Sequence, residues 1–89
     1  MINSFKCQET ERIFNGLSSR SFPADIQALA ERKLRMLNAS EMMEDLSIPP
    51  GNHFESLKGG RCSIKIDDKY KIYFNWIHGE AQDVEITCF

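Results

Sequence analysis

The chain has 89 residues, 42% of them hydrophobic and 27% charged, which fits one small globular domain over residues 1–89. It contains neither the roughly 18-residue apolar run of a membrane span nor a secretory signal, so we expect a cytoplasmic protein. The spacing of its cysteines and histidines does not fit a disulfide framework or a zinc site, so we expect no metal or cofactor. The net charge of −2 argues against a free-standing nucleic-acid binder, because such proteins usually carry a basic surplus.

The N-terminal part predicts a short strand and a short helix. Ile2–Phe5 is an apolar segment typical of an edge strand. Gln8–Asn15 predicts a helix, and Gly16 suits the left-handed position that ends it.

A second, longer helix follows a polar connector. Ser21 is its expected N-cap, Pro23 lies in its first turn, and it runs to about Asn38. Apolar residues recur at three- and four-residue steps and form one stripe: Ile26, Leu29, Ala30, Leu34 and Leu37. The basic residues expected to point away from this stripe are Arg32, Lys33 and Arg35. Ser40–Leu46 predicts a further turn or two, and Pro49-Pro50-Gly51 ends the helical half.

The pattern then changes to the alternation of β-strands. Turns expected at 67–69 and 78–79 join three segments into an antiparallel meander. Its apolar, even-numbered face should lie on the helices and consists of Cys62, Ile64, Ile66, Tyr70, Ile72, Phe74, Trp76, Val84 and Ile86. Its odd-numbered face carries Lys65, Lys71 and Tyr73 and should be open. Helices followed by a sheet predict an α+β architecture.

Charge is uneven along the C-terminal half. Residues 41–57 contain four acidic and no basic residues, and residues 72–89 contain three acidic and no basic ones. Residues 58–71 contain five lysines or arginines against two aspartates. One basic segment therefore lies between two acidic segments.

An ordered set of short motifs resembles HigB-type (plasmid maintenance killer) toxins of the RelE/ParE superfamily over nearly the whole chain. The motifs of the first half are Ser4-Phe5-Lys6, Ile13-Phe14-Asn15-Gly16, residues 33–39 and Pro49-Pro50-Gly51-Asn52. Those of the second half are Leu57-Lys58-Gly59, Ser63-Ile64-Lys65-Ile66, Tyr70-Lys71-Ile72, Phe74-Asn75-Trp76 and Asp83-Val84-Glu85-Ile86. The resemblance implies a RelE-like fold, with an N-terminal strand and two main helices packed on a twisted antiparallel sheet. It also implies a type II toxin that cleaves messenger RNA on the ribosome and is neutralised by a HigA-like antitoxin.

Metal-independent RNA cleavage uses the ribose 2′-OH as nucleophile, so it needs a base, an acid and cations around the phosphate. The resemblance assigns catalytic roles to Lys58 and Arg61, to Lys71 where relatives have arginine, and to Glu55 where some relatives have histidine. Expected RNA-binding residues are Lys65, Tyr73 and Phe89. His53 and His78 are expected at the surface.

The C-terminus departs from the family, which commonly ends in Asp-Tyr-His. Cys88 and Phe89 stand where the first two of these residues would align. Phe89 can stack on a base but cannot transfer a proton. Three functions therefore stay open: a ribosome-dependent endoribonuclease, a weakened toxin that acts as an antitoxin-binding module, and, on fold analogy alone, a ParE-like gyrase inhibitor.

Overall fold

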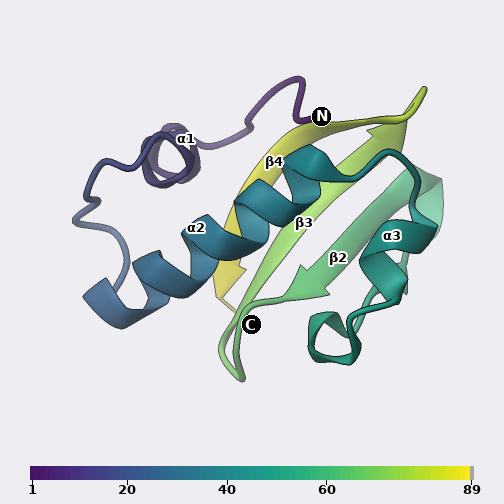
Figure 1. The fold of residues 1–89 in the computed structure, drawn as a ribbon. Helices are drawn as coiled ribbons and strands as arrows, with labels where there is room; N and C mark the ends of the chain where they lie inside the picture. Colours follow the sequence, from purple (N-terminus) through teal and green to yellow (C-terminus); the bar gives the residue numbers. More distant parts are fainter. Residues whose placement is uncertain (89) are drawn as a thin grey trace.

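The structure is a computed structural model, and it describes residues 1–88 (Figure 1). The helices come first in the chain: α1 Gln8–Phe14, α2 Ala24–Ala39 and α3 Glu44–Ser47. The strands follow as β1 Glu55–Ser56, β2 Arg61–Lys65, β3 Tyr70–Ile77 and β4 Glu80–Cys88, with 3₁₀ turns η1 at Pro50–Asn52 and η2 at Lys58–Gly60. All strand pairs are antiparallel, in the order β1-β2-β3-β4. This arrangement confirms the predicted α+β, RelE-like fold.

The molecule has two layers with the core between them. Figure 1 shows α2 running across one face of the sheet, with α1 on the β4 side and α3 on the β2 side. The centre of the core is made of residues with no exposed surface on α2, α3, β2 and β3: Leu34, Leu37, Leu46, Ile64, Ile72 and Phe74. Within residues 1–88, no helix is long and apolar enough to cross a membrane.

The α2 helix differs from its prediction at two positions. Leu29 is 38% exposed, although it was expected in the apolar stripe. It lies one residue before the buried Ala30, which turns it about 100° away around the helix. Pro23 occupies the N-cap, and Ser21 does not cap the helix. The Ser21 N–H instead donates to Ser19 Oγ at 3.1 Å, so the connector satisfies its own polar groups.

Lys33 also differs from its prediction, because it was expected to point away from the core but contacts a buried side chain. Its Nζ donates to Oδ1 of the fully buried Asn52 at 2.5 Å. Asn52 Nδ2 donates in turn to the Leu46 carbonyl at 2.9 Å. This buried amide therefore ties α2, α3 and η1 together. Burial lowers the pKa of Lys33 below its usual 10.5, and the neighbouring Arg32 lowers it further.

A β-bulge in β4 shifts the alternation of side chains. Tyr73 pairs with Glu85, whereas Asn75 pairs with Gln82, so two residues of β4 lie opposite one of β3. Asp83 lies in the bulge with a left-handed φ of 53°. The odd-numbered Ala81 is consequently fully buried before the bulge, whereas Val84 and Ile86 lie in the core as predicted.

The outer edge of β4 is covered by the N-terminal segment. Ile2 and Phe5 form isolated parallel bridges with Ala81 and Val84, so Ile2–Phe5 lies at the sheet edge as predicted but without forming a continuous strand. Farther along, the Ile86 N–H donates to the buried Thr10 Oγ1 at 3.0 Å. These contacts satisfy backbone groups that would otherwise offer a site for edge-to-edge aggregation.

Candidate active site

The strand register arranges the open face of the sheet, opposite the helices, in three transverse rows. The central row crosses all four strands through Glu55, Ser63, Tyr73 and Glu85. One flanking row consists of Arg61, Asn75 and Gln82, and the other of Lys65, Lys71 and Thr87. Neighbours within a row are about 5 Å apart and adjacent rows about 7 Å apart. The structure therefore brings Glu55, Arg61, Lys65, Lys71 and Tyr73 onto one face.

Arg61 reaches from β2 across β3 to β4. Its Nη2 forms an ion pair with Glu85. Its Nη1 donates to the Asp83 carbonyl at 3.2 Å and to Asn75 Oδ1 at 3.5 Å. Its guanidinium carbon lies 5.8 Å from the centroid of the Tyr73 ring, within the range of a cation–π contact. The Arg61 side chain is therefore held in place by partners on β3 and β4.

Lys71 reaches in the other direction, from β3 across β2 to β1. Its Nζ lies 2.9 Å from Glu55 Oε1 and donates a hydrogen bond to it. This bond to the Glu55 carboxylate raises the pKa of Lys71, and Tyr73 raises it further. Lys71 is consequently an ammonium at neutral pH. The side chain of Glu55 remains 53% exposed, so water and ligands can reach its carboxylate.

Every cation of the two flanking rows has a carboxylate partner. Besides Arg61 and Lys71, Lys65 pairs with Asp68 at 3.1 Å. Glu85 also receives Lys6 from the N-terminal segment, at 3.6 Å. The face is thus close to charge balance, although the cations alone had been expected to dominate it.

Glu85 and Asn75 are the partners of Arg61 on this face whose roles the sequence analysis did not predict. Both are odd-numbered members of strands whose even-numbered residues were assigned to the core. Extending the same alternation to polar residues would have placed them beside Tyr73. The alternation along the strands therefore predicted their positions, but an acidic residue is not expected among groups that bind phosphate.

Lys58 and the C-terminus lie at the margins of this arrangement. Lys58 is exposed in η2, and among the described residues it forms no ion pair. Its carbonyl accepts the Arg61 N–H, which places it next to the Arg61 row rather than the Lys71 row. Thr87 pairs with Lys71 on the open face, whereas Cys88 pairs with Tyr70, which packs on the core. Phe89 lies outside the described residues.

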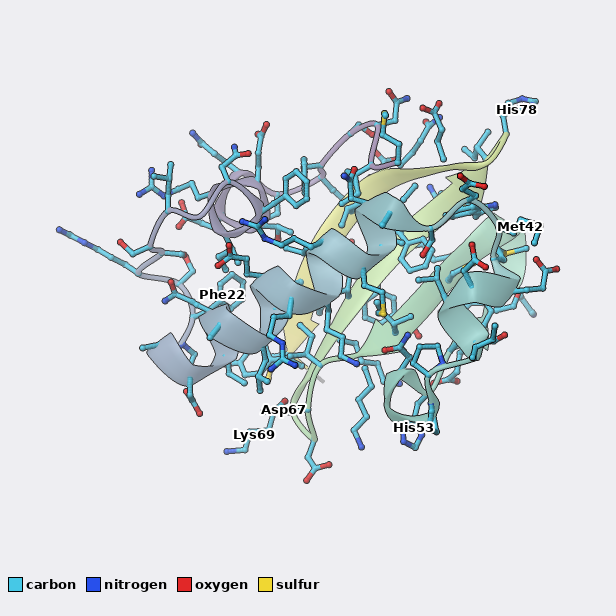
Figure 2. All side chains as sticks on the ribbon, viewed as in Figure 1. Phe22, Met42, His53, Asp67, Lys69 and His78 are labelled. Atoms are coloured by element: carbon cyan, nitrogen blue, oxygen red, sulfur yellow. The ribbon has the colours of Figure 1, made fainter. Side chains whose placement is uncertain are left out.

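The two histidines are far from each other and at the periphery (Figure 2). His53 ends η1 and His78 lies in the β3–β4 turn, both exposed and both with left-handed backbone. Among residues 1–88, no group of three or more His, Cys, Asp or Glu side chains is placed to hold a metal ion.

Residues 3–87 match the family model described as the RelE-like toxin of the type II toxin–antitoxin system HigB. The chain belongs to this family. It is also 43% identical over 65 residues to Toxin HigB-1 of Vibrio cholerae, a match that covers 70% of this chain and 68% of that protein. An uncharacterized protein of Haemophilus influenzae is 31% identical over 72 residues, covering 78% of this chain and 71% of that protein. Membership in the family implies an antitoxin partner.

Proposed function

We propose that this HigB-like toxin is a cytoplasmic, ribosome-dependent endoribonuclease that cleaves messenger RNA by attack of a ribose 2′-OH on the adjacent phosphate. The observation that carries the proposal is the Lys71–Glu55 pair, a cation and a solvent-accessible carboxylate 2.9 Å apart on the open face. The reaction needs no metal, because protein cations and donors stabilise the charge that develops on the phosphorane.

Lys71 and Glu55 have complementary roles in this mechanism. The Lys71 ammonium, whose raised pKa keeps it charged, stabilises the pentacoordinate phosphorane. Glu55 accepts the proton of the 2′-OH when the arriving phosphate draws Lys71 away from it. As the 2′-oxygen bonds to phosphorus, the bond from phosphorus to the 5′-oxygen breaks, and water supplies the proton for this leaving oxygen. A carboxylate is only a modest base for a hydroxyl group, so we expect slow cleavage.

The remaining candidates bind the RNA strand. Lys65 lies in the same row as Lys71, and Lys58 lies in the exposed turn before β2. These positions support a role for both lysines in contacting backbone phosphates. Tyr73 at the centre of the face and Phe89 beyond the described residues supply aromatic rings for stacking on bases. With a net charge of −2, the free protein should bind RNA measurably only at low salt, and the ribosome is expected to supply the additional binding free energy in the cell.

The test is induction in a bacterium that lacks the antitoxin, with growth followed while messenger RNA 5′ ends are mapped. The variant is Lys71→Ala, and the matched control is Lys69→Ala, an exposed lysine at the β2–β3 turn (Figure 2). We expect new 5′ ends and growth arrest with the wild type and with Lys69→Ala, but not with Lys71→Ala. Intact transcripts and normal growth with soluble wild-type protein would refute the nuclease.

A second candidate function is a weakened toxin that binds the antitoxin without cleaving RNA. It is favoured by the position of Cys88, which stands where the family commonly has aspartate and pairs with Tyr70 on the core side of the sheet. Pull-down with the product of the adjacent small DNA-binding gene tests it, and no complex would exclude it. Unchanged plasmid supercoiling would exclude the ParE-like gyrase inhibitor, which rests on the shared fold alone.

The antitoxin is expected to be HigA-like and to contact the helices and the open face. Acidic or apolar antitoxin side chains would lie against Lys58 and Lys71, because opposite charges speed association and fix register. Full binding by a Lys58→Glu, Lys71→Glu double variant would contradict this placement.

A further inference from the structure

We propose that Arg61 reads a nucleobase of the bound RNA rather than a phosphate, and that guanine is the base it prefers. This inference rests on the proposed function, because it requires single-stranded RNA on the open face. It assigns different tasks to the two ends of the face: base recognition in the Arg61 row and phosphate binding in the Lys71 row.

The charge of Arg61 is already balanced within the protein. Glu85 holds its Nη2, and both side chains are mostly covered, at 22% and 25% exposure. A phosphate that replaced Glu85 would leave this carboxylate without its guanidinium partner and next to a second anion. The cost of such an exchange is high, because an ion loses much of its hydration when it is partly buried. Arg61 is therefore poorly suited to bind a phosphate.

The geometry of Arg61 instead suits a fixed hydrogen-bond donor. Asn75, the Asp83 carbonyl and Glu85 occupy three of its five N–H groups, and the Tyr73 ring supports the guanidinium. Within residues 1–88 the other two N–H groups of Arg61 have no acceptor, and the planar group that carries them is held in place. Guanine presents two neighbouring acceptors, O6 and N7, to which arginine commonly donates a pair of hydrogen bonds.

Lys71 differs from Arg61 in the properties that matter for phosphate binding. Its partner Glu55 is 53% exposed, so the carboxylate can return to water when a phosphate takes its place. Its ammonium is a compact charge on a flexible stem, without the planar shape that recognises a base edge. The ion pair at the Lys71 end of the face is therefore the one that an RNA phosphate can open.

The experiment compares two double variants that each remove one ion pair without changing the net charge. These are Arg61→Gln/Glu85→Gln and, as the matched control, Lys71→Gln/Glu55→Gln. Fluorescence anisotropy measures their affinity for short oligouridine RNAs that carry one central G, A, C or U. The central nucleotide and its neighbours are 2′-deoxy, so no cleavage occurs. Affinities are measured over a range of salt concentrations, and urea unfolding confirms that each variant is folded.

We expect wild-type protein to bind the G-containing RNA about tenfold more tightly than the others. Arg61→Gln/Glu85→Gln should lose this preference and keep the wild-type salt dependence. Lys71→Gln/Glu55→Gln should keep the preference, while its slope of log affinity against log salt falls by about 0.7, the value for one phosphate contact on a single strand. The single variant Arg61→Lys retains the charge and should also lose the preference.

Three results would overturn the inference: equal wild-type affinity for all four RNAs, a reduced salt slope with retained G preference in the Arg61 double variant, or no RNA binding by the wild type even at the lowest salt concentration, where screening is weakest. The proposed function is judged separately, by messenger RNA cleavage in cells. Cleavage that persists alongside any of these three results would leave the nuclease standing and remove only the role of Arg61.

Discussion

Replacing Asn52 by alanine should be among the most damaging single changes in this chain. Asn52 is fully buried, accepts a hydrogen bond from the Lys33 ammonium at 2.5 Å and donates to the Leu46 carbonyl at 2.9 Å. A hydrogen bond to a charged group contributes about 1.5–3 kcal/mol, and an unpaired buried carbonyl costs about 1–3 kcal/mol. We therefore expect a loss of about 3–5 kcal/mol. Chains of 89 residues unfold with a free energy of only about 4–13 kcal/mol.

Urea unfolding measures this loss through the fluorescence of Trp76, the single tryptophan of the chain. Trp76 packs edge-on against Phe74 at 6.5 Å and should respond to loss of the core. The midpoint should fall while the slope m stays unchanged. The control, Arg35→Ala, breaks an exposed ion pair on α2 and should cost less than about 1 kcal/mol. A loss below about 1 kcal/mol for Asn52→Ala would refute the reasoning.

Three further predictions concern stability. Burial lowers the pKa of Lys33 in the folded chain, so the unfolded chain binds more protons just below pH 10.5. The free energy of unfolding should therefore rise with pH in that range. Urea unfolding of Lys33→Met, measured over the same pH range, should lack the part of the rise that Lys33 contributes. Thr10→Val leaves the buried Ile86 N–H unpaired and should cost about 1–3 kcal/mol in urea unfolding; an unchanged midpoint would contradict this. At the bulge, Asp83→Gly should keep or raise the Tm because φ is 53°, whereas Asp83→Val should lose about 1–2 kcal/mol in calorimetry; equal Tm values for the two variants would argue against strain.

Local patterning predicted most of the fold. The three-and-four spacing of α2 and the alternation in β2 and β3 each identify a buried face, because a helix or strand presents its side chains at a fixed period. Most of the buried positions predicted from those periods are buried in the structure. The periods were wrong at Leu29, on the margin of its stripe, and they assigned no face before Asp83, where one extra residue reverses the alternation. A bulge has no periodic signature, so Ala81 was not assigned to the core.

The candidate site was predictable in its members but not in its electrostatics. The alternation places Lys65, Lys71 and Tyr73 together, and the resemblance adds Arg61 and Glu55. The sequence does not predict which carboxylate pairs with which lysine or arginine, because the pairing depends on the register between strands. Lys33 was misassigned for a similar reason, because its partner Asn52 lies 19 residues away on a different element.

The order of charges along the chain nevertheless indicates which segments form ion pairs, once the order of the strands in the sheet is known. An acidic, a basic and an acidic segment follow one another from residue 41 to residue 89. Because the strands are neighbours in sequence order, the outer acidic segments contribute β1 and β4, and the basic segment contributes β2 and the start of β3. Acids therefore flank bases in space as they do in sequence, which produces the Glu55–Lys71 and Glu85–Arg61 pairs.

This internal pairing determines how the open face meets any anionic partner. An RNA phosphate and an acidic antitoxin side chain both have to compete with a resident carboxylate for the same cation. A charge-balanced face attracts such partners weakly at long range, because steering depends on an uncompensated potential. Binding must then rely on contacts that form after the encounter, such as stacking, base-edge hydrogen bonds and apolar packing on the helices. Selectivity for the correct partner follows from those short-range contacts, while the cations supply charge only once a resident carboxylate has been displaced.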